Sequence, residues 1–435
     1  MDIKLIFRAL KHRNYRLFFI GQVVSLTGTW MQMVAMSWLV YRMTNSALLL
    51  GLVGFLGQMP SFFLTPFAGV IADRYNRRKI LLITQISAML QALVLSFLVM
   101  TNSVQVWQVV LLSMVLGFVN SFDIPVRQAF TIEMIENKED LGNAIALNSS
   151  MVNIARLIGP SVAGIIVATL GEGPCFLLNA LSYVAVIVSL SMMRILGKER
   201  RKERRHVLHE LKEGFAYAYN FIPIKHILIL LSVVSLTGVP YQVLMPIFAK
   251  DIFHGGAQTL GFLMSMAGCG ALMGAIYLAA RKSIIGLGRI IAQAALCFGI
   301  GVSVFSFCRN FWLALLLICI AGFSMMVQMA ASNTILQTIV EEDKRGRIMS
   351  FYSMSFIGIT PFGSLLAGIL ASRIGAPFTL LSGGVCCIIT AMVFWRKLPL
   401  IRKHIHPIYV KKGIIPDEVV KGIGAASGLE VLSEK

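Results

Sequence analysis

Arg156 is the residue best suited to bind a charged molecule, because it stands in the middle of a long apolar segment. Ser149, Asn153 and Pro160 lie at helical spacing from it, so the four residues share one helix face. An ionisable group at such a position is costly and is a functional candidate by default. The stripe predicts that Arg156 and Asn153 contact an anion or polar substrate, or that Arg156 is a structural bridge between helices.

Asp123 and Arg127 form a second charged pair, four residues apart in a neighbouring apolar segment. Residues at this spacing meet on one helix face. Burial raises a carboxyl pKa and a nearby cation lowers it, so the pair is a candidate for proton coupling. It can equally be a static ion pair that joins its helix to the helix of Arg156, and we favour that interpretation. Asp123 is also a candidate fixed partner for Arg156.

Small residues recur along the Arg156 segment in the pattern A-x8-A-x3-G-P-x2-A-G. In lipid, small residues let a second helix approach closely, which replaces the missing hydrophobic attraction between helices. A proline removes one backbone donor and bends the helix. The pattern therefore predicts a tightly packed helix interface. Its residues are Ala146, Ala155, Gly159, Pro160, Ala163 and Gly164.

Uncharged polar residues in other apolar segments outline a candidate cavity. Tyr241 follows Pro240, and a broken helix at membrane depth is tolerated only against protein or water. Any single polar stripe is more often helix packing than ligand contact, but several together favour a polar interior. With Arg156 and Asn153, the predicted substrate contacts are Gln32, Gln58, Gln328 and Tyr241.

These residues must be positioned by helices that cross a membrane. The chain of 435 residues is 57% hydrophobic and 14% charged, with a mean hydropathy of +0.78, whereas soluble domains carry about 25% charged residues. A span needs about 20 apolar residues, so the sequence predicts an all-α membrane protein with twelve transmembrane helices. They are expected near residues 15–41, 46–72, 79–101, 105–131, 141–171, 174–196, 224–251, 257–281, 286–308, 311–338, 347–374 and 376–398.

The net charge of +19 is unevenly placed along the chain. Positive clusters at residues 4–16, 74–79, 194–212 and 396–412 alternate with nearly uncharged connections. This is the positive-inside pattern of a multi-pass protein, and it places both termini in the cytoplasm. It argues against nucleic acid as a partner. We expect no cleavable signal, because the first apolar run is too long for a signal peptide.

Two related halves are indicated by matching residues. Gly117-Phe118 is matched by Gly322-Phe323, and Ala163-Gly164 by Ala367-Gly368. Parallel repeats of this kind hold a substrate site between them near the midplane. We expect an N-terminal six-helix half at 1–196 and a C-terminal half at 224–398. A charged linker with a short surface helix is expected at 197–223, and a loosely ordered cytoplasmic tail at 399–435.

The segment GVIADRYNRRKIL, residues 69–81, resembles the G-x-x-x-D-R-x-x-R-R loop signature of the major facilitator superfamily. The resemblance implies a gate that holds the cytoplasmic side shut and breaks when the protein opens inward. A carboxylate at Asp73 suits the amino-terminal end of a neighbouring helix dipole. A solvated basic loop is the alternative interpretation. The implied gating residues are Gly69, Asp73, Arg74, Arg77 and Arg78.

The A-x8-A-x3-G-P-x2-A-G pattern resembles the fifth-helix signature of major facilitator antiporters, with Ala where that signature prefers Gly. Residues 120–130, 141–160 and 345–363 resemble the subgroup that includes enterobactin-exporter-like and macrolide-efflux-like proteins. The resemblance extends in weaker form over most of the chain to Leu400. It implies the twelve-helix fold with two pseudo-symmetric halves and outward transport.

We therefore expect a monomeric secondary transporter of the bacterial inner membrane and not an enzyme. It would export a mid-sized amphipathic molecule, siderophore-like or drug-like, with a proton as coupling ion. The chain has no P-loop for ATP and no metal-ligand cluster, so we expect no cofactor and no metal. The alternatives are an importer or facilitator of a small metabolite on the same fold, and a membrane scaffold or sensor without transport.

Overall fold

The computed structural model describes residues 7–193, 216–281 and 283–414. Within these ranges the chain forms helices and no strand. The segments η3, η4 and η5 are π-helical, whereas η1 and η2 are short 3-10 helices. In chain order the elements are η1 (Arg8–Lys11), α2 (Arg13–Thr44), α3 (Ala47–Arg74), α4 (Arg77–Met100), α5 (Val106–Glu133), η2 (Lys138–Asp140), α6 (Leu141–Leu170), α7 (Glu172–Met192), α9 (Ile222–Val233), η3 (Val234–Gly238), α10 (Tyr241–Ile247), η4 (Phe248–Ile252), α11 (Ala257–Ala279), α12 (Leu287–Phe305), α13 (Phe311–Ile339), α14 (Glu342–Ser353), η5 (Met354–Gly358), α15 (Thr360–Ile374) and α16 (Ala376–Lys411).

The prediction of twelve transmembrane helices is confirmed, since twelve helical runs of the described chain are long and apolar enough to span a bilayer. Their helix ends lie within five residues of the predicted ends, except for the last helix. Local capping explains several starts. Ser46, Asn76 and Asn310 each accept a hydrogen bond from the backbone N–H three residues later, at the beginnings of α3, α4 and α13.

The last helix, α16, continues thirteen residues past the predicted end at 398, to Lys411. We expected a loosely ordered segment there. Instead Ile401, Ile405 and Tyr409, spaced four apart, are buried against the C-terminal helices. Lys412 donates a hydrogen bond to the Thr338 carbonyl at 2.7 Å. Packing of this stripe outweighs the two prolines inside the helix. The predicted linker up to residue 215 and the tail from 415 lie outside the described residues.

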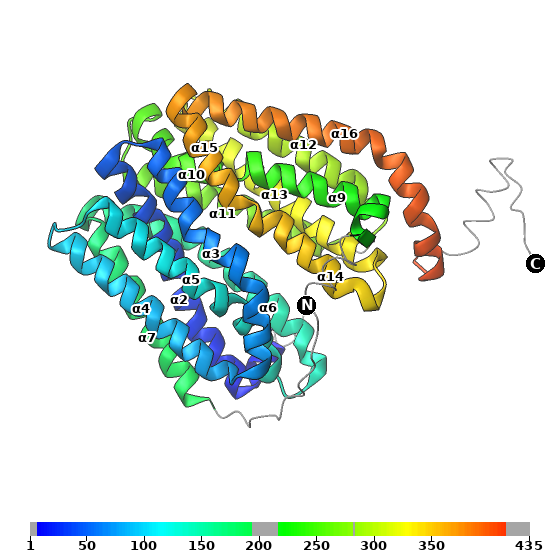
Figure 1. Cartoon of the computed structure of the whole chain (residues 1–435), viewed down its shortest axis with the longest axis horizontal. Coiled ribbons are helices and arrows are strands. Elements are labelled where there is room, and N and C mark those ends of the chain that lie inside the picture. The colour runs from blue at the N-terminus through cyan, green and yellow to red at the C-terminus, as the bar shows by residue number, and fades with distance from the viewer. Residues whose placement is uncertain (1–6, 194–215, 282, 415–435) are drawn as a thin grey trace, which may run out of the picture.

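The helices form two bundles, α2–α7 and α9–α16, that lie side by side (Figure 1). Helix neighbours repeat between them: α3 packs on α5 as α11 packs on α13, and α4 packs on α7 as α12 packs on α16. The residues that indicated the repeat make equivalent helix contacts in the two bundles. A methyl group on Gly117 would lie 2.2 Å from the Gly57 carbonyl oxygen, and one on Gly322 would lie 2.1 Å from that of Ala267.

The two bundles contact each other most closely near one end, here called the closed end. It contains the connections at residues 45–46, 171, 253–256 and 375. In α6 and α11, Gly164 meets Gly261, and in α3 and α15, Gly51 meets Gly368. At each of the four glycines a methyl group would come within about 3 Å of the facing helix backbone. Two equivalent helix pairs therefore join the bundles.

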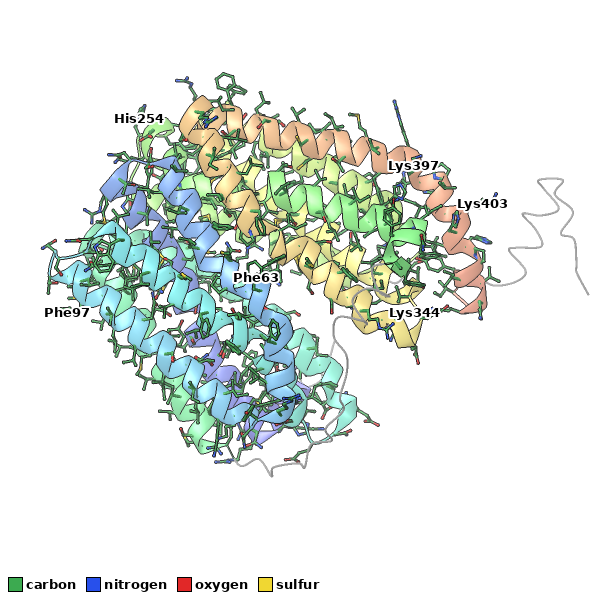
Figure 2. All side chains as sticks on the ribbon, viewed as in Figure 1. Phe63, Phe97, His254, Lys344, Lys397 and Lys403 are labelled. Atoms are coloured by element: carbon green, nitrogen blue, oxygen red, sulfur yellow. The ribbon has the colours of Figure 1, made fainter. Side chains whose placement is uncertain are left out.

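The ribbons of the bundles diverge toward the opposite end, here called the basic end (Figure 1). It contains the α3–α4 connection, η2, the start of α14 and the end of α16. In Figure 2, Lys344, Lys397 and Lys403 lie toward this end, and His254 lies at the closed end. Phe63 of α3 is exposed and lies near the middle of the molecule in Figure 2. Its neighbour Phe62 contacts Phe362 of the opposite bundle, with 5.5 Å between the ring centroids.

Candidate functional site

Arg156 lies in the middle of α6, where helices of both bundles meet. It is fifteen residues from the first residue of the helix and fourteen from the last. Its guanidinium carbon is 5.5 Å from the centroid of the Trp30 ring in α2. It also interacts electrostatically with Tyr241 of α10. On the far side, a methyl group on Gly268 of α11 would lie 2.6 Å from the Arg156 carbonyl oxygen. Two helices from each bundle therefore meet at this residue.

The Arg156 side chain makes no hydrogen bond or ion pair with any residue that the structure describes. The Arg156 side chain is partly exposed, although the residue is central in the bundle. Its surroundings are aromatic: the Tyr241 ring is fully buried and packs edge-on against Phe298 at 6.1 Å. The guanidinium thus has five N–H donors available beside the partly exposed Trp30 ring, which suits an anionic or polar ligand with an apolar body.

Three other predicted substrate contacts, Asn153, Gln58 and Gln328, differ in whether their side-chain amides already have a hydrogen-bond partner. The Asn153 amide donates to the Ser149 carbonyl of its own helix at 2.9 Å, and Gln58 donates to the Gly54 carbonyl of its own helix at 3.3 Å. The buried Gln328 amide of α13 has no hydrogen-bond partner among the described atoms on either its oxygen or its nitrogen. Gln328 is therefore a polar group available for a ligand or a water.

Gln32 lies inside the N-terminal bundle, and not between the bundles. Its amide nitrogen donates to Gln91 of α4 at 3.0 Å, and its oxygen accepts from Asn179 of α7 at 2.7 Å. A buried amide with both ends engaged fixes the helices around it. We therefore leave Gln32 out of the proposed substrate site.

Asp123 and Arg127 form an ion pair on α5, with a separation of 3.4 Å between carboxylate and guanidinium. The same carboxylate also accepts hydrogen bonds from Thr84 at 3.0 Å and Gln85 at 2.7 Å, both on α4. The helix joined to α5 is thus α4, and not the helix of Arg156 that we expected. Hydropathy cannot tell which neighbouring helix a buried carboxylate will face. Asp123 is also not the partner of Arg156.

The small-residue pattern of α6 serves two different neighbours. A methyl group on Gly159 would lie 2.6 Å from the Trp30 Cβ of α2, within the same bundle. The Pro160 carbonyl and Gly164 face Gly261 of the opposite bundle. Of the remaining small residues, Ala155 and Ala163 are buried, whereas Ala146 is exposed, so the predicted tight packing is wrong at that position. Close packing of this helix on both sides brings Arg156 to the boundary between the bundles.

The predicted gating segment spans the end of α3 and the start of α4. Gly69 and Asp73 belong to α3, and the Asp73 side chain is outside the described part of the structure. Arg77 forms an ion pair with Glu133 of α5 at 3.0 Å, and Arg78 donates to the Ser191 carbonyl of α7 at 2.6 Å. Both arginines tie helix ends of one bundle together. Arg74 is exposed.

One contact across the closed end was not predicted from the sequence motifs. The Tyr41 hydroxyl of α2 donates to the Asp251 carboxylate of η4, and Lys250 donates to the Asn45 side chain at 2.6 Å. Each bond joins the two bundles. We call these four residues the closed-end latch. The sequence did offer a hint of this contact, because Tyr41 and Asp251 both lie in the last turn of the first spanning helix of their repeat.

Known proteins resemble this chain over most of its length. Residues 6–409 match the family described as "Transmembrane secretion effector". The chain is 27% identical over 390 residues to the "Staphyloferrin A transporter" of Staphylococcus aureus, covering 88% of this chain and 96% of that one. It is 22% identical to "Macrolide efflux protein A" of Streptococcus pyogenes, covering 88% and 96%.

Among solved structures, a bacterial homologue of the human lysosomal transporter Spinster, crystallised inward-facing and unoccupied, shares the fold. The TM-score is 0.69 at 13% identity, covering 91% of this chain and 98% of that one. The family match and the twelve spanning helices identify a multi-pass transporter of the bacterial membrane, and not an enzyme. The chain belongs to the transmembrane secretion effector family of the major facilitator superfamily.

Proposed function

We propose that the protein exports mid-sized amphipathic molecules, siderophore-like or drug-like, by alternating access driven by a proton gradient. The observation that carries the proposal is the position of Arg156 between two bundles that are joined at one end and diverge at the other (Figure 1). A site at such a boundary can be exposed to one side of the membrane and then to the other. The relatives named above support export and the substrate range.

The basic end would face the cytoplasm, since it carries the positive clusters of the chain. Both termini would then be cytoplasmic, and the described conformation would be inward-facing. The closed-end latch and the paired glycines would hold the outer side shut and separate when the protein opens outward. Because both bundles of the site belong to one chain, a monomer would be sufficient for transport.

The test uses inverted membrane vesicles with an acidified lumen and a panel of radiolabelled macrolides and siderophores. We expect the vesicles to accumulate at least one compound, and the accumulation to vanish when nigericin collapses the proton gradient. Gly164→Val should abolish accumulation, because added carbon would collide with the Ala257 carbonyl 2.8 Å from an added methyl group. Gly142→Val is the matched control on the same helix, since nothing lies within 4 Å of it.

Other outcomes would overturn the proposal in distinct ways. Uptake only by right-side-out vesicles would identify an importer. Accumulation that survives nigericin would remove the proton as coupling ion. If no compound moved in either orientation, the exporter proposal for these two substrate classes would be refuted.

A further inference from the structure

Among the residues that the structure describes, no acid balances the charge of Arg156. Five acids in or next to the helix bundles have a partner other than Arg156, and no described acid forms an ion pair with Arg156. Asp123 pairs with Arg127, Glu133 with Arg77, Glu172 with Arg42, Asp251 with Tyr41 and Asp140 with Lys11. Within the described chain, the aromatic contact of this guanidinium is the Trp30 ring at 5.5 Å, and Tyr241 interacts with it electrostatically.

An unbalanced cation at this depth is unfavourable for folding. A charge taken out of water is costly unless an opposite charge or hydrogen bonds compensate it. A cation–π contact with one tryptophan contributes about 0.5–2 kcal/mol in general, which offsets only part of such a cost. Because Arg156 is partly exposed, the compensating group can come from outside the described chain, as water or as a bound ligand.

The internal repeat shows that close packing between the bundles does not need a charged residue at the position of Arg156. Gly164 and Gly368 make equivalent contacts with the opposite bundle. Eight residues before each of them stand Arg156 and Thr360. The equivalent helix therefore joins the bundles with a neutral residue at this position. Arg156 breaks the symmetry at the boundary where a ligand would bind.

We propose that Arg156, with Trp30, forms a site for an organic carboxylate that carries an aromatic or other apolar body. The inference rests on the proposed function and specifies its substrate class. A planar guanidinium binds a carboxylate through two parallel hydrogen bonds. One carboxylate neutralises one arginine, whereas a phosphate monoester carries about −1.5 to −2 charges and would leave an excess. The partly exposed Trp30 ring provides contact for the apolar body.

The test is calorimetric titration of the purified full-length protein in detergent with naphthaleneacetate and with naphthaleneacetamide. The two molecules have the same ring system and differ in charge. We expect naphthaleneacetate to bind at least tenfold more tightly than the amide. Arg156→Gln should remove this preference, and Arg156→Lys should retain only a small part, because an ammonium cannot form the paired hydrogen bonds of a guanidinium.

The matched control is Arg289→Gln. Arg289 lies 5.7 Å from the Trp395 ring, so it offers the same cation–π chemistry at a different place. This variant should keep the full preference for the carboxylate. Naphthyl phosphate is titrated in parallel and should bind more weakly than naphthaleneacetate.

Three results would overturn the proposal. They are equal binding of naphthaleneacetate and its amide, a preference that survives Arg156→Gln in folded protein, and no binding of naphthaleneacetate at millimolar concentration. Failure of the export function is separate. If the preference for the carboxylate is found but energised vesicles accumulate nothing, the carboxylate site is supported and the export function is refuted. If vesicles accumulate compounds but the protein does not prefer naphthaleneacetate over its amide, the export function is supported and the carboxylate site is refuted.

Discussion

The Tyr41 hydroxyl at the end of α2 donates a hydrogen bond to the Asp251 carboxylate at the end of η4, across the boundary between the two bundles. Lys250, the residue before Asp251, bonds to Asn45 of the first bundle at 2.6 Å and lies 5.5 Å from the Tyr41 ring. These contacts close one end of the molecule while the other end diverges. The contacts at this end, the close helix crossing beside it and two charged groups elsewhere in the molecule can each be tested.

Removing the Tyr41 hydroxyl should shift the protein toward the state that is open at the latch. Tyr41→Phe keeps the ring and deletes one hydrogen bond, worth about 1 kcal/mol or a roughly fivefold change in population. Pulsed EPR distances between labels at Leu48 and Phe378, exposed residues of opposite bundles near the closed end, measure this population. The native cysteines would first be replaced.

Arg42→Gln is the control for the latch. It breaks the 2.6 Å ion pair with Glu172 at the same end, but both residues belong to the N-terminal bundle. The label distances should therefore stay as in the parent protein. Equal distance distributions in Tyr41→Phe and the parent would refute the latch.

Adding one methyl group at the α6–α11 crossing should weaken the joined end. In Gly164→Ala the new Cβ would lie 2.8 Å from the Ala257 carbonyl oxygen, so the helices must move apart. Overpacking of this kind costs about 1–3 kcal/mol. Thermal unfolding in detergent should show a lower midpoint for Gly164→Ala, and Gly142→Ala on the same helix should leave it unchanged or raised. A midpoint unaffected by Gly164→Ala would contradict the close contact.

Asp123 and Arg127 should behave as a static pair. Breaking a buried pair costs about 3–5 kcal/mol; because the Arg127 side chain is 22% exposed, we expect a loss of about 2 kcal/mol for Asp123→Asn. The pH dependence of transport should be the same as in the parent protein. The double variant Asp123→Asn, Arg127→Gln should recover part of the stability, since no cation is then left unpaired. Loss of proton-driven transport in a stably folded Asp123→Asn protein would instead assign the coupling to this carboxylate.

The Asp140 cluster predicts an acid-sensitive contact at the basic end. Asp140 pairs with Lys11 at 2.7 Å and with His12 at 2.8 Å, and Arg8 also contacts it. The hydrogen bonds from Lys11 and His12, with the charge of Arg8, hold the pKa of this carboxyl below its usual value. A lowered folded-state pKa contributes stability above the unfolded pKa, and that contribution is lost as the pH falls through the folded pKa.

The corresponding measurement is the thermal midpoint of the parent protein and of Asp140→Asn across pH. The parent should be more stable at neutral pH and at about pH 5, and the difference should disappear at a pH below about 4, the ordinary carboxyl range. A difference that shrinks between about pH 7 and pH 5 would show that another group controls the contact.

The sequence by itself determined the spans, the repeat and the small residues that join the bundles. Hydropathy and spacing are local properties, so α6 and its glycines could be predicted without knowing their neighbours. The matches Gly117 with Gly322 and Gly164 with Gly368 preserve equivalent contacts in the structure. The extension of α16 was missed because its apolar stripe lies beyond the span, where a window of hydropathy gives no signal.

Only the tertiary structure decided which polar groups meet. Asp123 bonds to α4 rather than to the helix of Arg156, Gln32 is engaged inside one bundle, and Tyr41 reaches Asp251 across 210 positions of the chain. Such pairings depend on the rotation and depth of each helix in the bundle. Those are set by side-chain packing between helices far apart in sequence, whereas periodicity specifies only the face that a residue occupies.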